Sequence, residues 1–373
     1  MIAGILKEPQ GENRVSLLPE QAATLVKKGI TVLVEEGAGY NSFAVNNTYT
    51  EKGIKVVSRK ELLQQSDIVF SIQLLTAEDQ SSLKSNAVLV GVFQPLFQYQ
   101  AMQQWSTKGL STFSLDMLPR TTRAQAMDVL SSQANIAGYK AVLVAANLFP
   151  RYFPMFMTAA GSIPPAKVLI LGAGVAGLQA IATAKRLGAV IEVFDTRPAV
   201  KEEVMSLGAK FVEVEGAADA SKAGGYAVEQ SEEYKQKQQQ KLAESAAKAD
   251  IVITTAQIPG KKAPILLSEA MLANMKAGSI IIDLASATGG NTPFTKNNET
   301  IVHNGITILG NSNLPSTMPF DASKLYGKNV LNFLQLILTK EGAINLNFDD
   351  DLVKGSCITH GGAIVNDRVK ALL

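Results

Sequence analysis

The chain of 373 residues has only one cysteine and two histidines, and this scarcity excludes several kinds of chemistry. Cys357 has no second cysteine with which to form a disulfide, which fits a reducing compartment. Neither His303 nor His360 belongs to a zinc-ligand spacing or to a cysteine–histidine nucleophile pair. The sequence therefore predicts no metal site, and it offers no obvious general acid or base for a small substrate.

The chain also lacks a strong charge imbalance and long apolar runs. Its net charge is +2 without a basic block, which argues against a nucleic-acid partner. No apolar run reaches the roughly 18 residues that would predict a direct membrane span. The opening MIAGILKEP has no basic segment and no small-residue cleavage site, so we expect no signal peptide. The composition, 46% apolar and 18% charged, is typical of a globular protein large enough for two domains.

Apolar runs alternate with helical patterns in the N-terminal region of the chain, which predicts βαβ units and a parallel sheet. The expected strands are Ile2–Leu6, Thr31–Val34, Ile68–Ile72, Ala87–Phe93 and Thr112–Leu115. Helices are expected between them, for example at Pro19–Lys28 and Arg59–Gln65. A long helix should follow from about Arg123 to Leu148, before Pro150 and Pro154.

A second βαβ series is expected between Lys167 and Leu309. Its six apolar runs are 168–171, 190–194, 210–214, 250–254, 279–283 and 305–309. Another helix is expected from Asp321 to Thr339, and the run near Asp351–Ile358 looks like a short strand. We expect this tail to return to the first domain.

The second series opens with a glycine pattern within Lys167–Arg197. Gly172, Gly174 and Gly177 follow a buried strand at G-x-G-x-x-G spacing, and a helical pattern comes next. The first glycine permits a tight turn, the second allows close approach of a pyrophosphate, and the third lets the helix pack on the strand. Asp195 ends the next strand, 23 positions beyond Gly172. This context predicts a dinucleotide site with phosphates at the helix N-terminus.

These patterns together predict an α/β protein with two Rossmann-like, doubly wound parallel-sheet domains. The expected first domain is discontinuous, 1–137 plus 320–373, and the second domain, 138–319, is inserted in it. Long helices should join the two domains, and the cleft between them is where we expect a ligand.

Two residues bear on the choice of dinucleotide. Asp195 can accept hydrogen bonds from both ribose hydroxyls, and its charge would repel a 2′-phosphate, which favours NAD(H) over NADP(H). Arg197 weakens that inference, because an arginine in this loop can accommodate a 2′-phosphate.

A second polar group lies in RTTRAQAMDVLSSQANIAGY. Its members are Arg120, Gln125, Asp128 and Ser131. The spacing places the last three at i,i+3 steps, where they could orient a nicotinamide carboxamide and its ribose. From spacing alone we favour another interpretation, a solvated helix start capped by Thr121 or Thr122.

The segment 215–240 interrupts the strand–helix alternation. Gly224, Gly225 and Tyr226 lie in its middle, ahead of a polar helix rich in Gln and Lys. A solvated surface insertion and a functional lid over a bound ligand are equally compatible with this composition.

Long motifs carry a family resemblance over nearly the whole chain. They include KEPQGENRVSLLPE, RTTRAQAMDVLSSQANIAGYKA, MTAAGSIPPAKVLILGAGVAGLQAIATAKRLGA, AGGYA, TTAQIPGKKAP, IIDLASATGGN and GSCITHGGAIV. The chain resembles the NAD(H)-binding component, or α1 subunit, of proton-translocating nicotinamide nucleotide transhydrogenase, in the family that also contains alanine dehydrogenase. The resemblance implies direct hydride transfer between NAD(H) on this chain and NADP(H) on a partner, coupled to proton translocation across the membrane by the whole complex.

The resemblance also implies roles for individual residues. Arg120, Gln125, Asp128 and Ser131 match the loop that positions the nicotinamide and its ribose. Gly225 and Tyr226 match a mobile loop that closes over the nucleotide. The implied pyrophosphate, adenosine and further nucleotide contacts are Val175, Asp195, Thr196, Arg197, Gln238 and Gln257.

The partners implied by the resemblance are a second copy of the chain, an NADP(H)-binding component and a membrane proton-channel component. The expected location is cytoplasmic, peripheral on the cytoplasmic face of the bacterial inner membrane through those partners.

Alanine dehydrogenase is the alternative function that the resemblance leaves open. That enzyme has a lysine, a histidine and an aspartate at the positions that are Ser71, Phe93 and Ala287 here. Arg14, which matches its substrate-carboxylate arginine, is present, but arginine alone cannot exchange the protons that the reaction needs. Transfer of hydride between two nicotinamides needs alignment and exclusion of water, and no protein acid or base.

Overall fold

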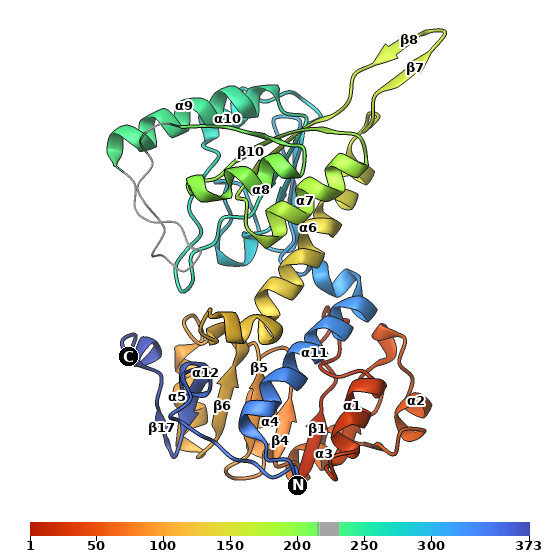
Figure 1. The fold of residues 1–373 in the computed structure, drawn as a ribbon, viewed down its shortest axis with the longest axis vertical. Coiled ribbons are helices and arrows are strands. Elements are labelled where there is room, and N and C mark those ends of the chain that lie inside the picture. The colour runs from red at the N-terminus through yellow and green to blue at the C-terminus, as the bar shows by residue number, and fades with distance from the viewer. Residues whose placement is uncertain (215, 217–230) are drawn as a thin grey trace. The chain divides into compact units, whose positions relative to one another are not determined.

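The computed structural model describes residues 1–214, 216 and 231–373. The expectations for Gly224, Gly225 and Tyr226 fall outside these described residues. The chain divides into two compact units, each with its own sheet and cores (Figure 1). Unit 1 is Met1–Gln133 with Ser316–Leu373, and unit 2 is Ala134–Pro315.

The sheet of unit 1 has the strand order β3-β2-β1-β4-β5-β6-β16-β17. The first six strands in chain order are parallel, and they are β1 (Ile2–Ile5), β2 (Thr31–Glu35), β3 (Lys55–Val57), β4 (Ile68–Phe70), β5 (Val88–Gly91) and β6 (Ser111–Ser114). The tail adds two antiparallel strands, β16 (Cys357–His360) on β6 and β17 (Ala363–Ile364) on β16.

Side chains of successive residues in these strands enter opposite cores, because strand side chains alternate between the two faces. Val88 and Val90 of β5 pack in one core and Leu89 in the other. Helices α1 (Pro19–Val26) and α11 (Pro319–Ile337) contribute to the first core, and α3 (Arg59–Gln65) and α5 (Tyr99–Thr107) to the second. The smaller helices of unit 1 are η1 (Tyr40–Ser42), α2 (Asn46–Thr50), α4 (Ala77–Ser82), η2 (Leu115–Met117), η3 (Thr122–Met127), α12 (Asp351–Ser356), η6 (Leu314–Thr317, which begins in unit 2) and α13 (Asp367–Lys370).

The sheet of unit 2 has the order β11-β10-β9-β12-β13-β15-β14. Its parallel strands are β9 (Lys167–Leu171), β10 (Val190–Phe194), β11 (Lys210–Phe211), β12 (Ile251–Thr254), β13 (Ile280–Asp283) and β15 (Ile306–Gly310), and β14 (Glu299–His303) is antiparallel at the edge. Renumbered within its own unit, each sheet runs 3-2-1-4-5-6 through its parallel strands, which is the doubly wound Rossmann order. The predicted fold class is therefore confirmed.

Helices cover both faces of the second sheet. Helices α6 (Val129–Leu148, which begins in unit 1) and α7 (Val175–Arg186) pack with alternate residues of β9, and α9 (Glu232–Lys248) and α10 (Glu269–Ala273) pack with the others. The remaining helices are η4 (Pro198–Val200), α8 (Lys201–Ser206) and η5 (Ser286–Thr288). Among the described residues, no helix combines the length and the apolarity that crossing a membrane requires.

Two local expectations were wrong. The helix expected from about Arg123 begins at Val129, because Asp128 has an extended backbone that separates it from the preceding 3-10 helix. The run at Asp351–Ile358, expected as a strand, starts as helix α12, because the Asp350 side chain accepts hydrogen bonds from two N–H groups of the first turn.

A β-hairpin that the sequence did not predict extends from the body of unit 2 (Figure 1). It consists of β7 (Phe156–Thr158) and β8 (Gly161–Ile163). No charged residue lies between Arg151 and Lys167.

Candidate functional site

The glycine turn of unit 2 lies where the order of its sheet reverses. Strands β9 and β12 are neighbours there, and ligands of doubly wound proteins bind beyond the carboxyl ends of such strands. Gly172 follows β9 with φ of 106°, a left-handed conformation that glycine adopts without strain. A Cβ on Gly172 would lie 2.2 Å from Oγ1 of Thr255, the residue after β12. The turn therefore needs glycine for both its conformation and its packing.

The other two glycines also fit the roles that the sequence assigned to them. A Cβ on Gly177 would lie 1.9 Å from the Gly172 carbonyl oxygen, so only glycine lets α7 approach the turn this closely. Among the residues that the structure describes, a Cβ on Gly174 would meet no atom within 4 Å, so none of them crowds the backbone at the start of α7. The first N–H groups of a helix have no partners within it and attract anions. These features fit a dinucleotide pyrophosphate.

Asp195 joins the end of β10 to this turn. Its Oδ2 accepts a hydrogen bond of 2.7 Å from the Ala173 N–H, between the first two glycines. Its Oδ1 accepts 2.8 Å from the Arg197 N–H, and the Arg197 guanidinium pairs with both oxygens at 2.9 and 2.7 Å. The hydrogen bonds that its guanidinium donates to Asp195 raise the pKa of Arg197 above its ordinary value.

Two residues that the sequence reasoning missed organise the loops after β12 and β13. Asn291 is fully buried, and it exchanges hydrogen bonds with the backbone of Ala256 and donates to the Pro264 carbonyl. Asp283 is fully buried as well, and it accepts from the N–H groups of Ala285 and Asn291. The motifs TTAQIPGKKAP and IIDLASATGGN are thus joined by hydrogen bonds. In the sequence, polar residues that follow buried strands could have indicated the roles of Asp283 and Asn291.

The remaining candidates of unit 2 are placed as follows. Val175 is the exposed first residue of α7, and Thr196 lies between Asp195 and Arg197. Gln257 is exposed and donates to the Leu284 carbonyl at 2.8 Å.

Gln238 lies on α9, one turn after Tyr234. Tyr234 is buried, and its burial raises the pKa of its hydroxyl. The negative charge of Asp195 is a second, smaller cause of the same shift. A buried aromatic in a polar helix was the signal that marks Tyr234.

The nicotinamide candidates all belong to unit 1. Asp128 caps α6, because its Oδ1 accepts from the Ser131 N–H at 2.9 Å and its Oδ2 from the Ser131 hydroxyl at 2.6 Å. Gln125 is exposed, and its backbone carbonyl accepts a hydrogen bond from the Asp128 N–H. Arg120 is exposed in the loop before η3. Thr121, one of the two expected capping residues, occupies the N-cap position of η3, but its side chain accepts no capping hydrogen bond there. The side chain that caps α6 is that of Asp128.

The sheet of unit 1 also has a switch point, the place where its strand order reverses, between β1 and β4. Glu8, beyond the end of β1, accepts hydrogen bonds from the backbone N–H groups of Ile72 at 2.6 Å and Gln73 at 3.0 Å, beyond β4. Burial raises the pKa of Glu8 to about 8, although the two N–H groups act in the opposite direction. The side-chain carboxyl group of Glu8 therefore connects the ends of β1 and β4 at this switch point.

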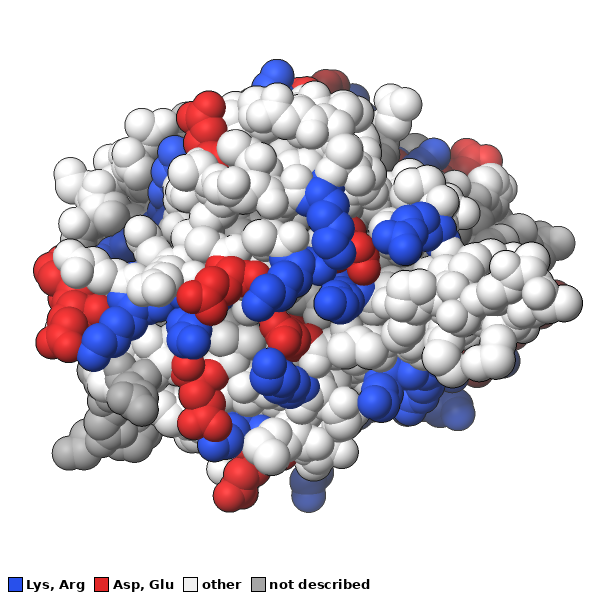
Figure 2. All heavy atoms as spheres, turned by 90° about the horizontal axis from the view of Figure 1, so that it is seen from above, with Lys and Arg blue, Asp and Glu red and all other residues white. Residues whose placement is uncertain are grey.

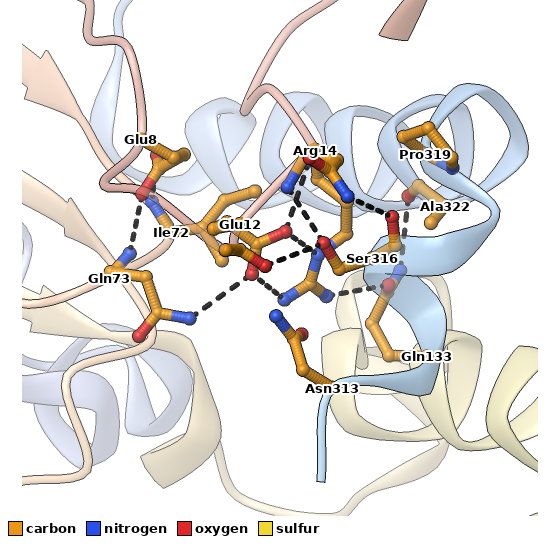
Figure 3. A network of polar contacts seen from close by, with 12 residues as sticks. Glu8, Glu12, Arg14, Ile72, Gln73, Gln133, Asn313, Ser316, Pro319 and Ala322 are labelled. Carbon is orange, nitrogen blue, oxygen red and sulfur yellow. Dashed lines mark hydrogen bonds and ion pairs between the residues drawn. The ribbon is translucent and has the colours of Figure 1, made fainter. Parts of the chain in front are cut away.

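Arg14 lies beside Glu8 and is held by its own neighbours (Figure 3). Its Nε and Nη2 donate to the two oxygens of Glu12 at 2.8 and 2.6 Å, and Nη1 donates to Gln133 at 2.8 Å. Burial opposes ionisation of Glu12, but the pairing with Arg14 outweighs it and lowers the pKa of Glu12.

The three positions that the resemblance matches to the lysine, histidine and aspartate of alanine dehydrogenase hold no acid or base here. The Ser71 hydroxyl is buried and donates to the Gln73 carbonyl at 2.8 Å. Phe93 is buried edge-on against Trp105, with ring centroids 5.1 Å apart. Ala287 is exposed in η5.

The doubly wound sheets and the glycine turn with Asp195 define a dinucleotide-binding protein of the Rossmann class. Family models for the alanine dehydrogenase/PNT N-terminal and C-terminal domains match residues 4–137 and 141–367. The chain belongs to the alanine dehydrogenase/PNT family, and it is a homologue of NAD(P) transhydrogenase alpha subunits.

Three relatives illustrate this. The chain is 44% identical over 365 residues to an NAD(P) transhydrogenase subunit alpha protein of Rhodospirillum rubrum, covering 95% of each chain. It resembles the crystal structure of transhydrogenase from Sinorhizobium meliloti at a TM-score of 0.89 and 43% identity, over 98% of this chain and 100% of that one. An L-alanine dehydrogenase structure shares the fold at a TM-score of 0.83 and 22% identity, over 100% and 99% of the two chains.

Glu8→Gln tests the buried carboxyl of unit 1. Because the folded state raises the pKa of Glu8, the contribution of Glu8 to stability should be fully present below its ordinary pKa of about 4.5 and should be lost as the pH rises through about 8. Glutamine has the same shape and does not titrate, so the variant should lose this decline, which amounts to about 1.4 kcal/mol for each unit of pKa difference.

Thermal unfolding from pH 5 to 9 measures the effect, with Glu51→Gln, an exposed glutamate, as the matched control. Parallel pH profiles for the wild type and Glu8→Gln would show that Glu8 ionises normally in the folded protein.

Proposed function

We propose that the chain is the NAD(H)-binding subunit of a proton-translocating transhydrogenase and exchanges hydride with NADP(H) on a partner component: NADPH + NAD⁺ ⇌ NADP⁺ + NADH. The observation that carries the proposal is the glycine turn whose Ala173 N–H is tied to Asp195 at the switch point of unit 2. An acidic residue there favours NAD(H) over NADP(H).

A bound nicotinamide ring supplies the hydride chemistry itself. The residues of the chain then have to bind, orient and keep water away, because a hydride moving between two rings needs close approach and alignment. In this proposal the glycine turn and the start of α7 hold the pyrophosphate, and Asp195 holds the adenosine ribose. Asp128 and Ser131, fixed to each other by two hydrogen bonds, orient the nicotinamide end together with Arg120 and Gln125.

The other residues implied by the resemblance are part of the same proposal. Val175, Thr196, Gln238 and Gln257 serve as nucleotide contacts, the Arg197 side chain lies beside the adenosine ribose, and Gly225 and Tyr226 form a closing loop.

Alanine dehydrogenase activity fits the chain less well. Phe93 fills its position with a ring packed on Trp105, and the Ser71 hydroxyl is bonded to a backbone carbonyl. Neither can take or give a proton as histidine and lysine do. Glu12 and Gln133 also hold the guanidinium of Arg14, the one retained substrate-binding candidate.

The partners in the proposal are a second copy of the chain, the NADP(H)-binding component and the membrane proton channel. They would keep the chain at the cytoplasmic face of the bacterial inner membrane, and proton translocation would be a property of the whole complex. The α-subunit relatives support such an assembly.

The β7–β8 hairpin supports self-association. Met155, Phe156 and Met157 expose 61%, 44% and 72% of their surface, and the Tyr152 ring stacks on Phe156. Exposed apolar patches of this kind mark protein contacts. Figure 2, viewed from the end at which the hairpin lies in Figure 1, shows a broad uncharged area beside interspersed basic and acidic side chains.

Hydride transfer to a partner is the direct test of the function. The purified chain, mixed with an NADP(H)-binding transhydrogenase component, should transfer hydride from NADPH to an NAD⁺ analogue in a rapid burst. Absorbance measures this transfer. If NADH binds but no transfer occurs, while alanine with NAD⁺ or pyruvate with ammonia and NADH turns over, the chain is an amino-acid dehydrogenase.

Gln125→Asn tests the nicotinamide end. Shortening the side chain by one methylene should leave NADH binding nearly unchanged and slow hydride transfer by about tenfold to a hundredfold, because small misplacements of reacting groups are costly. Rapid-mixing kinetics measures the transfer, and Gln104→Asn, on the exposed side of α5, is the control. A normal rate would remove Gln125 from the site.

Met157→Glu tests the hairpin. A charge in a buried apolar contact is costly, so the variant should shift the chain from dimer to monomer in sedimentation velocity. Met205→Glu, at an exposed methionine of α8, should leave the assembly unchanged. Equal masses for all three proteins, whether dimer or monomer, would exclude the hairpin as the contact.

A further inference from the structure

Within the part of the chain that the structure describes, the Asp195 carboxylate receives four hydrogen bonds. Two come from the backbone N–H groups of Ala173 and Arg197, at 2.7 and 2.8 Å. The other two come from the Arg197 guanidinium, from Nε to Oδ1 at 2.9 Å and from Nη2 to Oδ2 at 2.7 Å. A carboxylate offers about four lone-pair positions, so these donors use its full capacity.

The four donors differ in how easily they leave. The two N–H groups belong to the glycine turn and to the β10 loop, so they hold the carboxylate in place whatever the side chains do. The guanidinium is on a long side chain that retains 19% exposure, against 6% for Asp195. Displacing the guanidinium moves one long side chain, whereas displacing either N–H group would move the backbone of the turn or of the loop.

A ribose diol has two hydroxyl donors, and it needs the same two positions that the guanidinium occupies. We propose that Arg197 is a built-in competitor of the adenosine ribose at Asp195, and that it sets how strongly the chain prefers NAD(H) over NADP(H). The inference rests on the proposed function, since it concerns the nucleotide site assigned there.

The competition acts on the two nucleotides in opposite directions. NAD(H) has to break the bidentate ion pair before its diol reaches Asp195. NADP(H) carries a 2′-phosphate, which cannot donate to Asp195 but is attracted by the guanidinium. Arg197 thus weakens the binding of the first nucleotide and assists that of the second, and it reduces the discrimination that Asp195 alone would give.

Titration of the full-length chain with NADH and with NADPH, followed by nucleotide fluorescence, tests the proposal. Arg197→Ala should bind NADH about threefold to tenfold more tightly than the wild type, because the ribose no longer displaces a charged donor. It should bind NADPH more weakly, so the ratio of the two dissociation constants should rise by at least about tenfold.

Arg197→Lys keeps the charge and loses the bidentate geometry, so its NADH affinity should lie between those of the wild type and Arg197→Ala. This variant also serves if Arg197→Ala fails to fold. Asp195→Ala should weaken NADH binding and relax the rejection of NADPH. Arg186→Ala, which removes an exposed charge from the last turn of α7, is the matched control and should leave both affinities unchanged.

Weaker or unchanged NADH binding by both Arg197 variants would overturn the competition, since the guanidinium would then contact the nucleotide or have no effect on it. Failure of the wild type to bind NADH at all would instead overturn the proposed function. The two failures are therefore distinguishable in the same titration.

Discussion

Both units depend on one constraint, the reversal of strand order at the centre of a buried parallel sheet. In unit 2 this reversal lies between β9 and β12, and the segments that follow these two strands lead to opposite halves of the sheet. The backbone after each strand therefore has to turn within a small space. Gly172 and Gly177 satisfy that constraint, because a side chain at either would overlap Thr255 or the turn itself. The start of α7 and the Asp195 carboxylate are placed by this turn, and so are the phosphate-binding and ribose-binding features of the proposed site.

The carboxyl groups at the two switch points, those of Glu8 and Asp195, differ in their hydrogen-bond donors. In unit 1 the side chain of Glu8 bridges two strands through backbone N–H groups, and its burial raises the pKa to about 8, which suits a closed structural bridge. In unit 2 the carboxylate of Asp195 is paired with the Arg197 side chain, and the proposed competition with the ribose acts on this pair. Direct hydride exchange between two nicotinamides asks the protein only for fixed geometry. In the proposed function Asp128 and Ser131 contribute to this geometry, and their side chains are hydrogen-bonded to each other at the start of α6.

The sequence by itself determined the elements that depend on local pattern. Apolar runs of four to five residues indicated most of the buried parallel strands, such as β9 and β13, and the glycine spacing indicated the turn. The edge strands β3 and β14 and the hairpin went unpredicted, since half-exposed strands have no continuous apolar run. At α12 the apolar residues suggested a strand, and the cap at Asp350 decided for a helix.

Only the tertiary structure decided how the side chains pair. Asp195 and Arg197 are two residues apart in the sequence, which indicates neither their bidentate contact nor the bond to Ala173, 22 residues earlier. The same holds for Glu8 and the backbone of Ile72, and for Asn291 and the loop after β12. Such contacts depend on which loops the sheet order brings together, and that order results from packing of the whole chain.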